Sequence, residues 1–97
     1  MEHVIEESPT GLMCTVQVRS PLGLHARPAA RVAQVAQNYT ADIVLRLDDV
    51  AADAKSILDI LSLAASQGTK LTVEASGSDA REAITGIAEI FTEDTQG

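Results

Sequence analysis

The sequence predicts an α+β fold, in which a four-stranded antiparallel sheet is covered on one face by three helices in the order β-α-β-β-α-β-α. Segments in which apolar and polar residues alternate indicate strands with one buried and one solvated face. Between and after them lie segments whose apolar residues follow a single helical stripe. Such strands are typical of an antiparallel sheet that carries its helices on one face.

The strand pattern is clearest in residues 12–18, 42–47 and 70–76, where apolar residues occupy every second position. A shorter strand is predicted near residues 50–52, after an Asp-Asp turn. Each of these segments is short enough to be one strand of a small sheet. Together they supply the four strands of the predicted fold.

The helices are predicted over residues 26–37, residues 56–65 and a segment that begins near Ala80. Alanine is frequent in the first of them, and Gln67-Gly68 ends the second. The third follows a Gly-Ser-Asp turn that predicts a helix cap. Its apolar residues recur at helical spacing and form one stripe: Ala80, Ala83, Ile84, Ile87 and Phe91.

The chain has 97 residues, the size of one compact domain. We expect residues 1–10 to be a flexible acidic tail and residues 11–97 to be the folded domain. The net charge is −7, and the only aromatic residues are Tyr39 and Phe91. A chain that repels polyanions and lacks aromatic residues for base stacking is not expected to bind nucleic acid.

Cysteine usage and hydropathy indicate where the protein works. The single cysteine, Cys14, cannot form an internal disulfide, which fits a reducing compartment. The acidic N-terminus has no apolar segment of the kind found in signal peptides, and no apolar run approaches membrane-spanning length. We therefore expect a cytoplasmic protein without membrane insertion. Cys, His and acidic residues are not spaced for a metal site, so none is predicted.

The run GLHARPAA, at residues 23–30, places His25 and Arg27 where the first helix begins. If His25 is the N-cap, the free N–H groups of the first turn and the helix dipole favour an anion beside its ring. Arg27 can bind phosphate oxygens, and Pro28 is tolerated in a first turn because it lacks only an N–H that would be free. A histidine here is most often an ordinary capping or surface residue; anion binding and phosphoryl transfer to the imidazole are the functional alternatives.

The same run closely resembles the active-site signature of HPr, the histidine phosphocarrier family of the bacterial phosphoenolpyruvate-dependent sugar phosphotransferase system. AKSIL at residues 54–58 resembles the segment around the regulatory serine of that family. The pattern of residues 66–84 is similar to the last strand and helix of the family, and the resemblance spans residues 12–91 without evident insertions. It implies that the predicted sheet and helices form an open-faced β-sandwich.

The resemblance implies a stoichiometric phosphoryl carrier rather than an independent catalyst. Nδ1 of His25 would accept a phosphoryl group from phospho-enzyme I and pass it to a histidine of a IIA component. Arg27 and the backbone of Ala26 and Arg27 would hold the phosphate. No cofactor is expected, and the protein is expected to be a monomer that works between these partners.

Ser56 has a structural and a regulatory interpretation. Its position predicts the N-cap of the second helix, with Asp59 as a capping-box-like partner. By resemblance, it is also the residue that an HPr kinase/phosphorylase modifies in many relatives. The alternative function is therefore a regulatory binding module controlled by Ser56 phosphorylation, acting on carbon or nitrogen metabolism rather than sugar uptake. The intact His25–Arg27–Pro28 run favours the phosphocarrier, because a pure regulator needs no nucleophile there.

The second helix has more apolar residues than one buried stripe requires. A wide core face and an exposed docking patch both remain open on this pattern. The resemblance favours docking through Ile57, Leu58 and Leu61, with Arg31 and Lys55 nearby. Neutral or acidic residues stand where relatives often carry positive charge: Gln34, Gln37 and Asp59. This departure predicts either weaker electrostatic steering or partners that have co-adapted, and it favours a regulatory IIA protein over a sugar transporter.

Overall fold

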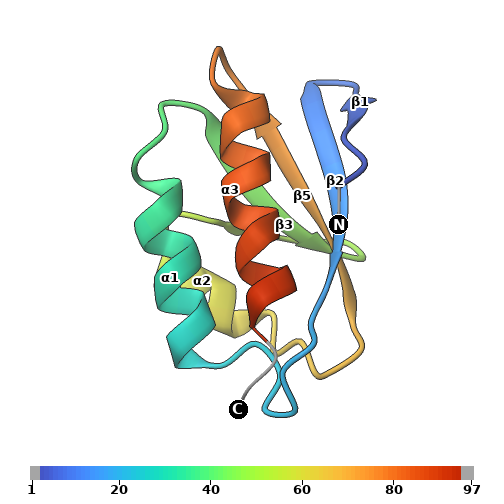
Figure 1. Cartoon of the computed structure of the whole chain (residues 1–97), viewed down its shortest axis with the longest axis vertical. Coiled ribbons are helices and arrows are strands. Elements are labelled where there is room, and N and C mark those ends of the chain that lie inside the picture. The colour runs from blue at the N-terminus through green and yellow to red at the C-terminus, as the bar shows by residue number, and fades with distance from the viewer. Residues whose placement is uncertain (1–2, 95–97) are drawn as a thin grey trace.

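A computed structural model describes residues 3–94 as a five-stranded antiparallel sheet with three helices (Figure 1). The strand order is β1-β2-β5-β3-β4, so the strands nearest in sequence are not all nearest in the sheet. The elements in chain order are β1 (Glu6–Ser8), β2 (Gly11–Gln17), α1 (Ala26–Ala36), β3 (Asp42–Leu47), β4 (Val50–Asp53), α2 (Ile57–Ser62), β5 (Lys70–Ser76) and α3 (Ala80–Glu93).

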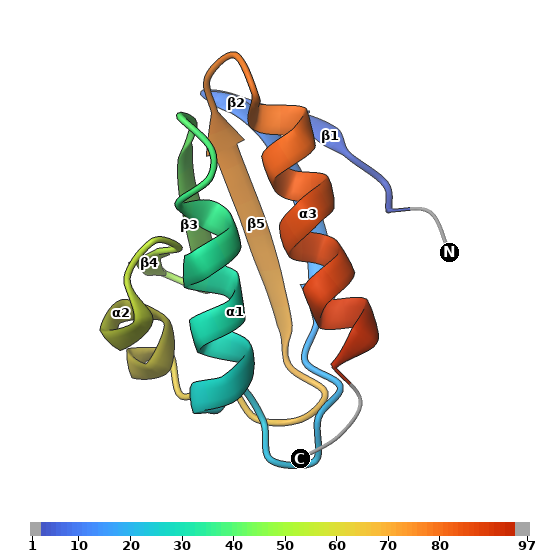
Figure 2. The same ribbon diagram turned by 60° about the vertical axis from the view of Figure 1, so that its left-hand side comes forward.

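The helices lie on one face of the sheet, as Figures 1 and 2 show, and the core fills the layer between. α1 and α3 pack side by side, and α2 lies along α1 on the side away from α3. The core is aliphatic, apart from Phe91, because the chain has almost no aromatic residues. Its largest fully buried residues come from strands and helices alike: Leu45, Leu71, Ile60, Ile84 and Ile87. The α+β class is therefore confirmed.

The predicted number of strands was one too low. Residues 6–8, which the sequence analysis placed in a flexible tail, form β1 and pair antiparallel with the start of β2. Ser8 lies opposite Gly11 and Glu6 lies opposite Met13, so Pro9 and Thr10 make the turn between them. Three residues are too few for an alternating pattern, and a strand this short is held by the backbone of its neighbour.

Two predicted element boundaries also differ. α2 ends at Ser62 rather than near residue 65, and Ala64 follows it with φ of +50°, a conformation that cannot continue a right-handed helix. β2 ends at Gln17, although Val18 remains buried and its N–H donates to the carbonyl of Thr69 at 2.9 Å. Element ends depend on local hydrogen bonds that hydrophobic periodicity does not report.

The predicted cap of α3 acts differently from the prediction. Asp79 is the N-cap residue, but its side chain makes no capping hydrogen bond to α3. Its carboxylate instead accepts from the N–H groups of Thr40 and Ala41, at 2.9 and 2.8 Å, and so fastens the loop between α1 and β3. The hydrogen bond from the Thr40 backbone lowers the pKa of Asp79 below its ordinary value of 3.8.

Candidate functional site

The loop between β2 and α1 presents His25 at the start of the helix. Ser20, fully buried, organises this loop: its Oγ accepts from the N–H of Leu22 at 3.2 Å, and its carbonyl accepts from the N–H of Gly23 at 2.9 Å. These bonds satisfy the backbone of a tight turn, as serine does in many turns. The turn brings the chain into extended geometry at His25, with φ −96° and ψ −172°.

Gly23 allows this loop to lie against the segment that follows α2. Its φ is +73°, and a Cβ there would lie 2.7 Å from the carbonyl oxygen of Ala65. A side chain would therefore meet both backbone strain and a backbone clash. That same carbonyl accepts from the N–H of Leu24 at 2.9 Å. The segment after α2 thus supports the loop that carries His25.

The imidazole of His25 is closed on one side. Nε2 is buried and has no hydrogen-bond partner among the described residues, while the residue as a whole is half-buried. Nδ1 is not among these buried atoms without a partner. The two ring nitrogens therefore differ in their surroundings. A buried nitrogen without a partner is rare and calls for a functional explanation.

The first turn of α1 leaves its donors free for an anion. His25 is the N-cap, as predicted, but its side chain does not cap the helix, and no acidic residue lies in the first turn. The first intrahelical bond runs from the N–H of Ala29 to the carbonyl of His25 at 3.1 Å. The N–H groups of Ala26 and Arg27 precede it, and Pro28 has none. Uncapped N–H groups and the positive end of the helix dipole together favour an anion.

Arg27 is exposed on the same turn, and within residues 3–94 it has no ion-pair partner. A guanidinium can make two parallel hydrogen bonds to phosphate oxygens. The structure therefore brings together the predicted acceptor ring, the backbone of Ala26 and Arg27, and the predicted phosphate-binding side chain. They form one small site at the start of α1.

Ser56 is the N-cap of α2, as predicted. Its Oγ accepts from the N–H of Asp59 at 3.3 Å. The reciprocal half of the predicted capping box is absent, because the N–H of Ser56 donates to the carbonyl of Asp53 at 3.0 Å. The Asp59 carboxylate accepts from the N–H of Asp53 at 3.3 Å instead. Side chains of the protein therefore accept hydrogen bonds from the backbone at the start of α2, and from Asp53 just before it.

The predicted docking residues on α2 differ in their exposure. Ile57 and Leu58 are exposed, whereas Leu61 is half-buried and packs against the core, beside the fully buried Ile60. The helix therefore has both a core face and an exposed apolar face. Figure 2 shows it alongside the half of α1 that begins at Ala26.

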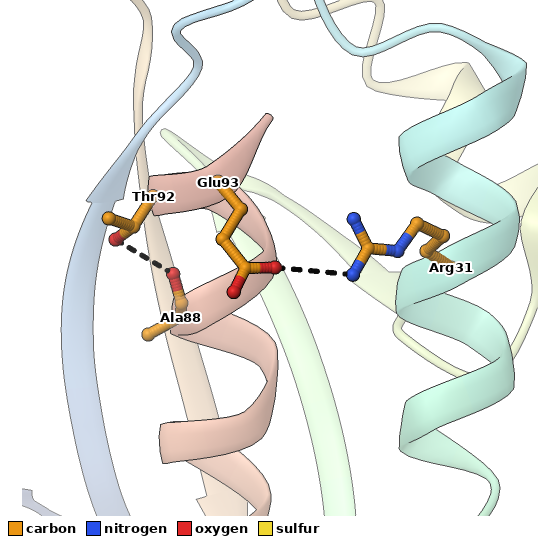
Figure 3. Close-up of polar contacts among 4 residues, drawn as sticks. All are labelled: Arg31, Ala88, Thr92 and Glu93. Atoms are coloured by element: carbon orange, nitrogen blue, oxygen red, sulfur yellow. Dashed lines mark hydrogen bonds and ion pairs between the residues drawn. The ribbon is translucent and has the colours of Figure 1, made fainter. Parts of the chain in front are cut away.

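The two nearby cations are engaged by the protein. Arg31 forms an ion pair with Glu93 at 3.3 Å, which joins α1 to α3 (Figure 3). The ammonium of Lys55 donates to the carbonyl of Tyr39 at 2.9 Å, and Gln37 donates to the carbonyl of Lys55 at 3.1 Å. These contacts brace α1 against its neighbours. The charge of Arg31 is therefore paired by a carboxylate, whereas that of Lys55 is not.

The sequence analysis did not single out Leu22, which is exposed in the loop before His25. Periodicity carries no signal in such a loop, since it reports only regular elements. A leucine between Pro21 and Gly23 in a turn was the available sign, because turns favour polar residues and glycine.

Within residues 3–94, the structure has a cavity away from this site, and it has no cluster of metal-binding residues and no membrane-spanning helix. A cavity of about 360 Å³ lies between the N-terminal segment, β2 and α3, and His25 does not line it. The part of the chain that the structure describes contains no group of three or more His, Cys, Asp or Glu residues placed to hold a metal ion. No helix among residues 3–94 is long and apolar enough to cross a membrane.

The fold is that of the histidine-containing phosphocarriers. A sequence model described as "PTS HPr component phosphorylation site" matches residues 12–93. The solved structure of HPr from Thermoanaerobacter tengcongensis superposes with a TM-score of 0.81 at 35% identity, covering 86% of this chain and 93% of that one. The chain belongs to the HPr family of the phosphotransferase system.

Two relatives with different names are similar to this chain at comparable sequence identity. The HPr-like protein Crh of Bacillus subtilis is 43% identical over 81% of this chain and 93% of its own length. The phosphocarrier protein NPr of Klebsiella oxytoca is 36% identical over 79% of this chain and 87% of its own. A crystal structure of Crh, with a TM-score of 0.69 over 81% of this chain and 91% of that one, is a domain-swapped dimer.

Proposed function

We propose that this protein carries a phosphoryl group on Nδ1 of His25. It takes the group from the phosphohistidine of enzyme I and passes it to a histidine of a IIA component. The observation that carries the proposal is the position of the imidazole at an uncapped helix N-terminus with Nε2 closed off. Nδ1 is then the nitrogen left to accept the phosphoryl group, and the neighbouring backbone offers free N–H donors to an anion bound there.

The transfer step exchanges one P–N bond for another. The lone pair of Nδ1 attacks the phosphorus, and the bond from phosphorus to the donor histidine breaks with its electron pair returning to the donor nitrogen. Attack through the Nδ1 lone pair requires the ring proton to be on the other nitrogen, the enclosed Nε2. No proton is gained or lost overall, so the chain needs no general base.

The groups around the ring hold the transferred phosphate. The N–H groups of Ala26 and Arg27 and the positive end of the α1 dipole stabilise its negative charge. The Arg27 guanidinium adds a bidentate contact. The exposed residues of α2, Ile57 and Leu58, dock the partner, while Leu61 supports them from the core side. No cofactor takes part, and we propose that the protein works as a monomer.

Phosphorylation by phosphoenolpyruvate and enzyme I from the same genome tests the proposal. We expect one acid-labile, base-stable phosphate by intact mass, which is lost in His25→Ala. Ser56→Ala is the matched control, because it alters the N-cap of the neighbouring helix and keeps the label. A wild-type chain that takes no label from an enzyme I that phosphorylates another HPr would overturn the proposal.

Regulation through Ser56 is a second candidate function, supported by the similarity of the chain to the HPr-like protein Crh. Ser56 is half-buried at the start of α2, where an added phosphate meets a favourable helix dipole. It would also add charge next to Ile57 and Leu58. Incubation with ATP and an HPr kinase/phosphorylase would give an acid-stable phosphate that is absent in Ser56→Ala. An unmodified wild-type chain would remove this candidate.

A further inference from the structure

Exposed apolar side chains are concentrated near His25. Among residues 3–94, five large hydrophobic residues are exposed. Leu22 is 65% exposed in the loop before His25, and Ile57 and Leu58 are 42% and 79% exposed on α2. The other two are Val4 and Val50. Single exposed hydrophobic residues are normal on a protein surface, but a group around one functional residue indicates an interaction site.

The loop holds Leu22 outward by specific bonds. Its own N–H donates to the Oγ of the fully buried Ser20, and the next N–H, of Gly23, donates to the Ser20 carbonyl. The turn is therefore anchored at both ends of Leu22. A side chain exposed by a fixed turn can enter a partner without the entropy cost of ordering a loop.

Leu22 is also close to the reacting ring and to α2. Three residues of fully extended chain span at most about 11 Å, which bounds the distance between the Leu22 and His25 Cα atoms. The loop meets the segment after α2 through the bond from Leu24 to Ala65. The loop that carries Leu22 and His25 is therefore packed against the segment that follows α2.

We infer that Leu22 is a specificity-determining contact for phospho-enzyme I, the phosphoryl donor. Its side chain fits an apolar recess beside the reactive histidine of that partner. The inference rests on the proposed function. Transfer requires the attacking Nδ1 to come within about 3–3.5 Å of the phosphorus that is bound to the partner's histidine. A partner that brings its own histidine this close covers the loop that carries Leu22.

The charges of the site favour an apolar contact as the main source of affinity. Arg31 and Lys55 are both engaged within the protein, by Glu93 and by the Tyr39 carbonyl. In the described part of the chain, Arg31 has an ion-pair partner, whereas the Lys55 ammonium is held by a carbonyl and keeps its charge unpaired. Arg27 serves the phosphate, and the net charge of −7 opposes long-range attraction to an acidic partner, so steering by positive charge is weak. Burial of Leu22 and of the exposed α2 residues then supplies most of the binding.

The rate of phosphorylation by phospho-enzyme I, measured against carrier concentration, tests this inference. We expect Leu22→Asn to raise the half-saturating concentration about tenfold, since a buried leucine contributes about that much to association. The maximal rate and the final amount of phosphate stay unchanged. Val50→Asn is the matched control, because Val50 is 54% exposed on β4 and changes neither quantity.

The possible outcomes distinguish the role of Leu22 from the proposed phosphocarrier function. Leu22→Met should keep the wild-type concentration dependence, because it retains an apolar side chain of similar volume. An unchanged half-saturating concentration in Leu22→Asn, or a change in maximal rate alone, would overturn the role of Leu22. A wild-type chain that takes no phosphate contradicts the proposed function itself.

Discussion

The first two helices of this chain begin in opposite ways. α1 begins at His25, whose side chain makes no cap, and its first turn contains no acidic residue. α2 begins at Ser56, whose Oγ accepts from the N–H of Asp59, and Asp59 places negative charge in the first turn. Serine and aspartate at these positions are the usual stabilising choices. The comparison shows that the start of α2 is capped by side chains of the protein, whereas the start of α1 has no such cap and can bind an anion.

The largest effect is expected from closing the start of α1 in the way α2 is closed. Ala26→Glu adds a carboxylate to the first turn of α1, on an exposed position. Repulsion of the phosphoryl group should slow transfer by at least about tenfold, since unit charges 4 Å apart interact by about 4 kcal/mol near a protein surface. Stability should stay equal or rise by about 0.5 kcal/mol, because an acid suits a helix N-terminus.

This variant is checked by single-turnover transfer from phospho-enzyme I and by urea unfolding. Ala26→Gln is the control, as it matches the size of glutamate without its charge. Equal rates for the two variants would mean that the start of α1 does not bind the phosphate.

A smaller effect, on stability, is expected from removing the side-chain cap of α2. Ser56→Ala removes the Oγ that accepts from the N–H of Asp59. Loss of an N-cap costs about 1 kcal/mol of unfolding free energy. Urea unfolding should show this cost, and the amount of phosphate on His25 should be unchanged. A stability equal to that of the wild type would show that the carboxylate of Asp59, rather than Ser56, secures this helix.

The smallest effect on stability is expected at Asp79, at the start of α3, and this effect should depend on pH. Its N-cap Asp79 binds the N–H groups of Thr40 and Ala41, and the Thr40 bond holds the pKa of the carboxyl below 3.8. The stabilisation is therefore fully present above pH 3.8 and is lost as the pH falls through the lower folded-state pKa. Asp79→Asn should unfold at lower urea than the wild type at pH 7, and the difference should shrink by pH 3.

Asn retains only one acceptor oxygen, so the comparison isolates the carboxylate. Urea midpoints at the two pH values give the measurement. A difference between the proteins that stays constant from pH 7 to pH 3 would show that the ionised carboxylate is not what fastens the loop.

The sequence was informative wherever a regular pattern extended over several turns or residues. Alternation predicted the sheet strands β2, β3 and β5, and the helical stripe predicted α3, because burial of one face imposes those periods. The positions of His25 and Ser56 before helical segments predicted both N-caps correctly. These predictions depend on residues close together in the chain.

The features that were missed depend on contacts between distant residues or on side-chain geometry. β1 has only three residues and is defined by its pairing with β2. Asp79 reaches Thr40 and Ala41 from far along the chain, so its local pattern indicated an ordinary helix cap. The ion pair of Arg31 was not predicted, because its partner Glu93 lies on another helix. The exposure of Leu22 follows from the way Ser20 folds the loop.

The two edges of the sheet have a consequence for the behaviour of the protein in concentrated solution. β1 has three residues and β4 has four, and both carry acidic side chains: Glu6, Glu7 and Asp53. Another chain that approached either edge would find few free backbone groups and a like charge. The longer strands β2, β5 and β3 lie inside these edges. The sheet is therefore built to resist edge-to-edge aggregation, even when many copies crowd together.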